Sequence, residues 1–459
     1  MTKVFLLSFF VGIHALAVVD HVMGYNQAGV HTDVVLVKRN GVMIFEGYDK
    51  ARGYSPKTSH LSWSMAKTIS GILMAQASVE YKFSLNDAVK KFIPEFKGET
   101  KIIDLIQMSS GIDFTEQYFG LPVSSDVVRM LYLDGAQSGA AGYVKSLPMR
   151  EKFKPGDHFY YSSGDTNLMM EVLKKVINDD KKYENYPWHK LFLPLGIQHA
   201  TFERDSNQVF IGSSYIYMSA PDYLRVGELI MNGGKWNKQQ IIPEFYVKLM
   251  HTLAPGVSQT PLEGTSSARA YGAQVTTNLP IEIRKMNSEH PDLPADALLL
   301  LGHQGQVMAV SPSEKLVVLR LAFDKGAAFN RAPFLAAVRQ LIIVNQPDYK
   351  TASDVKQYSE SDSRPTPSLI NTKLNILDLW KVPLLIRRYT AKEYCSCRFV
   401  AGRTHEACTF DVGLTMPLMP KIDVIESEMG KKKIVTKFFF GDENAVEFTG
   451  EKFGCRILN

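Results

Sequence analysis

Residues 60–70 read HLSWSMAKTIS and place Ser64 three positions before Lys67, at the start of a stretch with helical spacing. From Trp63 to Ala77 the apolar residues recur every three or four positions, as they do along a buried helix face. Residues three apart share one face of a helix, so the hydroxyl and the amine can touch if Ser64 begins the helix. The alternative is an ordinary helix with Lys67 at its surface, because chance produces about one or two S-x-x-K spacings in such a chain.

Whether a lysine amine can activate a neighbouring serine hydroxyl depends on burial. Serine is a poor nucleophile until a base removes its proton, and lysine acts as that base only where desolvation lowers its pKa from about 10.4. The unpaired backbone N–H groups at a helix start can also stabilise a developing oxyanion. We therefore predict that Ser64 is activated by Lys67 in a water-poor site.

The segments around this helix predict a sheet flanked by helices. Residues 34–48, VVLVKRNGVMIFEGY, form two apolar runs joined by Asn-Gly, the strongest short signal for a β-hairpin. Residues 298–323 resolve into short strands, and a helix follows from Pro333. Helical patterns fill most of the chain between them, including one predicted to be capped by Ser84 and Asp87. The order predicts an α/β (α+β) fold, with an antiparallel sheet built from both ends of the domain, a helical subdomain and a cleft.

Composition limits the partners of the chain. Its 459 residues are 45% hydrophobic and 22% charged, as in soluble globular proteins. The net charge of +5 is spread over 52 basic and 47 acidic residues, without the concentrated basic face that nucleic acids require. We therefore expect a small molecule or a peptide as the partner and no nucleic acid, and the oligomeric state stays open.

The N-terminus predicts an exported protein. Residues 1–17 contain one lysine, a short apolar run and an Ala-Leu-Ala ending, which is the layout of a signal peptide with its cleavage site. The run is shorter than the ~20 residues that span a bilayer, so we expect no membrane span after cleavage. We expect a main domain over 18–345, a polar linker over 346–370 and a separate C-terminal module over 371–459 in a periplasmic or secreted bacterial protein.

All four cysteines lie in the predicted C-terminal module. The pattern of Cys395, Cys397, Cys408 and Cys455 predicts two disulfides in an oxidising compartment, with the pairing left open. A zinc site is the alternative, but the spacing lacks a matched second pair of ligands. Apolar alternation after residue 421 predicts a small, β-rich, disulfide-bonded module, and we expect no metal or cofactor.

Two further motifs follow the S-x-x-K pair in order. KPGDHFYYSSGDTNLM places Tyr161 and Ser163 on a turn before a helix, and LLLLGHQGQVMAV places His303 and Gly305 on an expected strand. With these motifs, residues 30–345 resemble the class C β-lactamase and penicillin-binding-protein superfamily of serine hydrolases. The stretches SMAKTISGIL, LIQMSSGIDF and GHQG look most like its esterase and nylon-oligomer (6-aminohexanoate-dimer) hydrolase branch. The resemblance implies a β-lactamase-like fold.

The resemblance also implies roles for the motif residues. Ser64 would be the nucleophile, and either Lys67 or Tyr161 would take its proton, with Tyr161 later protonating the leaving group. Ser163 and His303 would line the cleft with their side chains, and Gly305 would allow substrate close to the strand. The backbone N–H groups of Ser64 and Gln306 would form the oxyanion hole.

Departures from the family pattern limit the substrate. His303 stands where β-lactamases commonly have the lysine of Lys-Thr-Gly, so the fixed cation that pairs with the carboxylate of a β-lactam or D-Ala terminus is missing. Ser163 replaces the asparagine of many members. Tyr118 and Asp126 sit where nylon-oligomer hydrolases have residues that contact substrate.

We expect an exported serine hydrolase that cleaves an ester or amide bond through an acyl-enzyme on Ser64. Two alternatives stay open at this point. The chain could be a catalytically silent member that binds peptidoglycan or another polymer, or it could be a D-Ala peptidase or β-lactamase.

Overall fold

The computed structural model describes most of the chain. The described residues are 19–20, 22–24, 27–117, 122–259, 269–326, 328–346, 376–416, 418–426, 432–438 and 443–458. The predicted signal peptide and residues 347–370 of the predicted linker lie outside them. Within these ranges, every helix is too short or too polar to cross a bilayer.

The central sheet begins with the hairpin that Asn-Gly predicts. Strand β1 (Thr32–Arg39) and strand β2 (Val42–Tyr48) pair antiparallel across a two-residue turn. Asn40 and Gly41 have φ values of 50° and 76°. Two successive left-handed residues make the type I′ turn whose twist matches that of a hairpin.

The later strands complete the sheet on the other side of β1. The order is β2-β1-β11-β10-β9-β8, and each neighbouring pair is antiparallel. Its later strands are β8 (Thr276–Thr277), β9 (Leu298–Gly302), β10 (Gln306–Ser311) and β11 (Leu316–Ala322). Because β1 pairs with β11, the first and last segments of the domain share one sheet, which confirms the predicted architecture.

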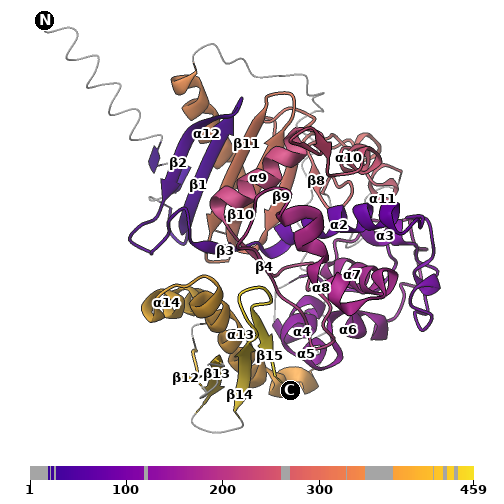
Figure 1. The fold of residues 1–459 in the computed structure, drawn as a ribbon, viewed down its shortest axis with the longest axis vertical. Helices are drawn as coiled ribbons and strands as arrows, with labels where there is room; N and C mark the ends of the chain where they lie inside the picture. Colours follow the sequence, from indigo (N-terminus) through magenta and orange to yellow (C-terminus); the bar gives the residue numbers. More distant parts are fainter. Residues whose placement is uncertain are drawn as a thin grey trace, which may run out of the picture.

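Alternating side chains of β1 supply two hydrophobic layers. Val35 and Val37 pack with α12 (Arg331–Asn345) on one face of the sheet, and Val34 and Leu36 belong to the larger core on the other. That second face is covered by α9 (Ala220–Met231), as Figure 1 shows. The period of two along the strand therefore places the sheet between layers of helices.

Helices fill most of the chain between β2 and β8. Besides α9, they include α2 (Ala66–Glu80), α3 (Ile102–Ile106), α4 (Asp126–Tyr132), α5 (Asp134–Ser138), α6 (Ala140–Ser146), α7 (Ser163–Ile177), α8 (Asp180–Pro187), α10 (Glu244–Met250) and α11 (Pro255–Ser258). Two small sheets lie among them, one of β3 (Ser59–Leu61), β4 (Thr201–Phe202) and β5 (Ile216–Ser219), the other of β6 (Lys235–Trp236) and β7 (Gln239–Gln240).

The helix predicted after Ser84 and Asp87 is wrong. Only a short 3-10 turn, Val89–Lys91, forms there. Val89 N donates to Thr100 O at 2.9 Å, and Ile102 N donates to Asp87 O at 3.1 Å. The backbone groups that a helix would use are therefore bonded to a neighbouring segment.

The C-terminal module contains helices as well as the predicted strands. Strands β12 (Lys421–Glu426), β13 (Lys432–Lys437), β14 (Asn444–Phe448) and β15 (Cys455–Ile457) form an antiparallel sheet in that order. Before them come α13 (Val382–Cys395) and α14 (His405–Thr415), which the prediction of a β-rich module missed. Both predicted disulfides form, one between Cys395 and Cys455 and the other between Cys397 and Cys408.

A buried polar joint connects this module to the main domain. Glu203, fully buried after β4, accepts hydrogen bonds on Oε1 from Ser396 Oγ and Cys455 N, both at 2.9 Å. Its Oε2 accepts an ion-paired hydrogen bond from Lys392, which is 2% exposed. A buried charge is tolerated only when it is paired and hydrogen-bonded, so this carboxylate ties α13 and β15 to β4.

Replacing this carboxylate should destabilise the whole protein. In Glu203→Gln the Lys392 charge stays buried without its counterion, and the expected loss is about 3 kcal/mol of unfolding free energy, measured in urea. Glu99→Gln is the matched control, because its ion pair with Lys90 is exposed and is worth about 0.5 kcal/mol. Equal urea midpoints for the two variants would show that the joint carries no stability.

Candidate active site

Ser64 and Lys67 lie at the start of the central helix. Ser64 belongs to a 3-10 turn, Trp63–Met65, that runs directly into α2. Lys67 Nζ lies 2.9 Å from Ser64 Oγ, 2.9 Å from Ser163 Oγ and 3.1 Å from the carbonyl oxygen of Ser213. Lys67 is 1% exposed, so the alternative of an ordinary helix with a surface lysine is excluded.

A carboxylate that sequence reasoning missed completes this cluster. Glu116 Oε1 accepts from Ser163 Oγ and its Oε2 accepts from Ser163 N, both at 2.7 Å. Ser163 is the first residue of α7, where an unpaired N–H and the positive end of the helix favour an anion. Loss of solvent raises the pKa of Glu116 above its usual range, and the nearby Lys67 opposes that rise.

The segment carrying Glu116 is held by Asp126. Its Oδ2 accepts from Thr115 N at 2.7 Å, and its Oδ1 accepts from the Tyr143 hydroxyl at 2.5 Å. Both oxygens therefore have protein partners, which indicates a role for Asp126 in placing Glu116, and the substrate contact expected for Asp126 stays a prediction. Tyr118, the other residue predicted there, lies outside the described residues.

Tyr161 lies beside the same amine. Its ring centroid is 5.0 Å from Lys67 Nζ and 4.6 Å from the guanidinium carbon of Arg269. A crevice contains both Ser64 and Tyr161. Its walls come from α2, the segment around β8 and strand β9, with Thr68, Arg269, Tyr271, Gln274, Val275, Thr276 and Leu299–Leu301 as the other lining residues. Ser64, Lys67 and Tyr161 thus meet at one place, and Arg269 adds a cation that the motifs did not indicate.

The H-Q-G motif forms a turn, and its prediction as a strand is wrong. His303–Gly305 connects β9 to β10, and Gln304 and Gly305 have φ values of 59° and 86°. Two left-handed residues in succession cannot continue a strand. His303 follows the last residue of β9, and its ring lies edge-on to Trp63 with 5.4 Å between centroids.

Packing explains the glycine of this turn and the glutamine that follows it at the start of β10. A Cβ on Gly305 would lie 1.9 Å from Asp324 Oδ2, so the packing around this residue requires glycine, and the close approach of substrate stays a prediction. The Gln306 side chain donates from Nε2 to Ala322 O at 2.5 Å and accepts from Ala322 N at 3.0 Å. Only the backbone N–H of Gln306 remains a candidate for the oxyanion hole, as the motif implies.

The described residues hold no cluster of three histidine, cysteine or acidic side chains suited to a metal ion. The buried S-x-x-K pair beside a tyrosine, in a crevice next to β9, instead defines a site of the serine-hydrolase type. The chain belongs to the Beta-lactamase family, whose sequence profile matches residues 17–339.

Known proteins resemble the chain over part of its length. A teichoic acid D-alanine hydrolase from Staphylococcus aureus is 27% identical over 209 residues, 42% of this chain and 47% of that protein. The chain spans between 34% and 47% of the length of these curated relatives. A putative 6-aminohexanoate-dimer hydrolase from Bacillus anthracis superposes with a TM-score of 0.51 at 19% identity, covering 68% of this chain and 78% of that one. EstCE1, a hydrolase with promiscuous acyltransferase activity, gives 0.54 at 17% identity, with 71% and 100% covered.

His303 should be a neutral imidazole over the physiological pH range. Burial disfavours the charged ring and lowers its pKa from 6.5 to about 4. In a histidine NMR titration, the His303 signal, assigned with a His303→Asn variant, should stay unchanged from pH 8 to 6 and move near pH 4. An inflection near pH 6.5, as in a free imidazole, would contradict this environment.

Proposed function

We propose that this protein is a serine hydrolase that cleaves small esters or amides through a covalent acyl-enzyme on Ser64. The observation that carries the proposal is the 2.9 Å contact between Ser64 Oγ and the buried amine of Lys67. Burial of such a pair has no structural need, because a serine and a lysine cost free energy when they leave water. Nucleophile activation gives a reason for it.

The proposed reaction has two acyl-transfer steps. Ser64 Oγ attacks the acyl carbon while its proton passes to Lys67 or Tyr161, and backbone N–H groups of Ser64 and Gln306 bind the oxyanion. The bond to the leaving group then breaks, and the stored proton goes to the departing alkoxide or amine. Water next attacks the acyl-Ser64 ester, releases a carboxylic acid and restores the serine hydroxyl.

Glu116 has a positioning role in this scheme. Its two oxygens hold the hydroxyl and the amide of Ser163, and the Ser163 oxygen in turn accepts from Lys67. One carboxylate thus orients Ser163, which is one of the three hydrogen-bonding partners of the amine. An ionised Glu116 suits this geometry, because both of its oxygens are then acceptors for the amide and the hydroxyl of Ser163.

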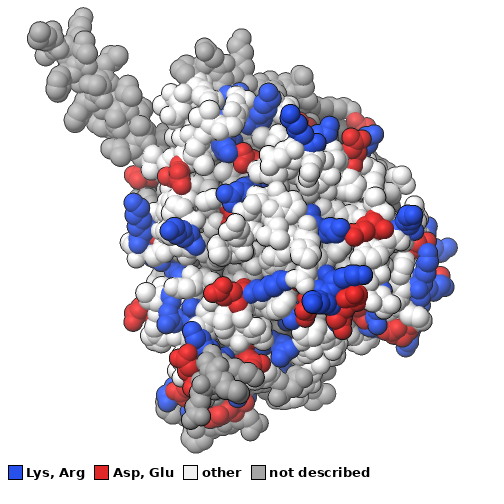
Figure 2. Space-filling model, in the orientation of Figure 1, with Lys and Arg blue, Asp and Glu red and all other residues white. Residues whose placement is uncertain are grey.

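The substrate class follows from charge and from the relatives. A neutral His303 supplies no fixed cation at the place where β-lactamases commonly have lysine, which disfavours β-lactams and D-Ala carboxylates. Arg269 is a second cation, but its guanidinium lies over the Tyr161 ring. A relative named as a D-alanine hydrolase and a structure named as a hydrolase with acyltransferase activity support an ester or amide. Basic and acidic side chains are interspersed on the face in Figure 2, with no large basic patch on that face of the kind that nucleic acids require.

We also propose that the protein acts outside the cytoplasm. Residues 1–17 have the layout of a signal peptide, and all four cysteines are paired in two disulfides. Such bonds persist in the periplasm or outside the cell, where no thiol pool reduces them.

Labelling with a fluorophosphonate tests the nucleophile. The wild type should be labelled and should hydrolyse a short-chain nitrophenyl ester, and Ser64→Ala should lose both activities because no hydroxyl remains to be acylated. Ser78→Ala is the control on the same helix, since Ser78 Oγ bonds only locally to Ala75 O. No labelling of the wild type would favour the silent polymer-binding alternative. Faster turnover of a chromogenic cephalosporin than of the ester would contradict the proposed substrate class.

The pH profile tests Glu116. Because its pKa is raised, the carboxylate takes up a proton at a higher pH than an ordinary glutamic acid, and ester hydrolysis should fall as the pH drops through that value. Glu116→Gln should lower kcat/KM about tenfold at pH 7 and remove this acidic limb. Glu99→Gln, at the surface, should keep both the rate and the limb. An unchanged profile in Glu116→Gln would assign the limb to another group.

A further inference from the structure

We propose that the disulfide-bonded C-terminal module is part of the catalytic machinery, with Thr415 as a positioning residue that holds Trp63 and so places Ser64. This inference rests on the proposed function for its kinetic consequence. The structural observation behind it is a pair of hydrogen bonds that connects Thr415, at the end of α14, through Gln304 to Trp63, the residue before the nucleophile.

Trp63 has a backbone conformation that needs support. Its φ is +44°, in the left-handed region that bulky residues rarely adopt. A residue is kept in such a region only where its surroundings over-determine it, and such residues cluster at functional sites. Ser64 follows directly, so any relaxation of Trp63 moves the nucleophile and the start of α2.

A single amide connects Trp63 to the module. Gln304 Oε1 accepts from the Trp63 indole Nε1 at 2.9 Å, and Gln304 Nε2 donates to Thr415 Oγ1 at 2.9 Å. Trp63 and Gln304 are each 5% exposed, so water does not compete freely for these bonds. Thr415 is the last residue of α14. Gln304 is itself left-handed, so the hydrogen bond from each end of its amide also supports the H-Q-G turn.

A second contact of Trp63 is also supported by the module. The Tyr215 ring lies 5.8 Å from the Trp63 ring, and Lys392 of α13 lies 3.9 Å from the Tyr215 ring centroid. The Tyr215 hydroxyl donates to Glu393 Oε1 at 3.2 Å. Trp63 is therefore held between a turn bonded to α14 and a tyrosine bonded to α13.

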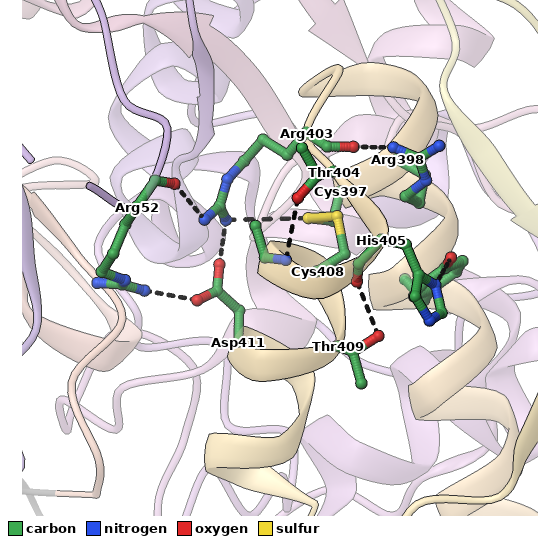
Figure 3. Close-up of a disulfide and its surroundings, with 11 residues drawn as sticks. Arg52, Cys397, Arg398, Arg403, Thr404, His405, Cys408, Thr409 and Asp411 are labelled. Atoms are coloured by element: carbon green, nitrogen blue, oxygen red, sulfur yellow. Dashed lines mark hydrogen bonds and ion pairs between the residues drawn. A yellow bond between two sulfur atoms is a disulfide. The ribbon is translucent and has the colours of Figure 1, made fainter. Parts of the chain in front are cut away.

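An ionic cluster fixes α14 against the main domain, as Figure 3 shows. Asp411 of α14 accepts from Arg52 at 2.5 Å and from Arg403, whose other nitrogen donates to Arg52 O at 2.9 Å. Arg52 also donates to Asp33 at 2.5 Å, and Asp33 bonds His60 of β3, the strand that leads to Ser64. The Cys397–Cys408 disulfide anchors the start of the same helix. Two series of polar contacts thus connect the module to the segment that carries Ser64. One runs through Gln304 to Trp63. The other runs through Arg52 and Asp33 to His60.

The kinetic consequence is a loss in kcat with little change in KM. Thr415, Gln304 and Trp63 are not among the described residues that line the crevice beside Ser64, so we expect their replacement to change KM little. Their effect reaches the reaction through the placement of Ser64, and small misplacements of reacting groups slow the chemical step.

The test compares three variants of the full chain. Thr415→Val removes the acceptor for Gln304 and should lower kcat about fivefold to tenfold, with KM within about twofold. Thr415→Ser keeps the hydroxyl and should restore the rate. Thr409→Val is the control on the same helix, because Thr409 Oγ1 bonds only to His405 O of its own turn. A kcat in Thr415→Val equal to that of Thr409→Val would overturn the inference.

A double-mutant cycle tests whether Gln304 carries the effect. Gln304→Leu should lower kcat by itself, and adding Thr415→Val should lower kcat no further, because both changes break the same series of hydrogen bonds. Additive losses would show that Thr415 acts by another route and would overturn the inference.

A readout without turnover separates this inference from the proposed function. With fluorotryptophan incorporated, the ¹⁹F signal of Trp63, assigned by its loss in Trp63→Phe, should shift in Thr415→Val and stay in place in Thr409→Val. A shift with an unlabelled, inactive wild type would support the structural coupling and reject the proposed hydrolysis. An unmoved signal would reject the coupling, whatever the activity.

Discussion

The contact between Lys67 and its three oxygen partners is the constraint on which the rest of the site depends. A primary amine that is 1% exposed must use its N–H groups, and here the partners come from the 3-10 turn before α2, from α7 and from the segment before β5. Each partner fixes one element relative to the others. The cost of burying this amine is therefore offset only when α7 and the segment before β5 are packed against the start of α2.

Short sequence patterns predicted those parts of the structure that depend on interactions between residues close together in the sequence. Asn40-Gly41 adopts the two left-handed conformations that the hairpin needs, and the S-x-x-K spacing places two side chains on one helical face. The order of the motifs was enough for the fold and the family. The prediction of a strand through His303 and Gly305 failed because an apolar run does not show where the backbone turns left-handed.

Contacts between distant segments were beyond the reach of these patterns. Glu116 is 47 residues from Ser163 and lies in a segment without helical or strand periodicity. Gln304 and Thr415 are 111 residues apart, and nothing near either residue indicates the other. The C-terminal helices were missed because closely spaced cysteines and later β-like alternation favoured a small sheet. In each case tertiary packing, and not local propensity, decided the outcome.

The pairing of β1 with β11 has a consequence for how the protein matures. These strands lie at opposite ends of the main domain, so the middle of the sheet stays open until residue 322 has joined it. The Cys395–Cys455 disulfide joins two residues that are 60 positions apart, in the part of the chain after this sheet. Such non-local closure is slow and leaves strand edges exposed in the partly folded chain. During synthesis, therefore, a nascent chain already contains Ser64 and Lys67 long before it has a framework able to hold them together.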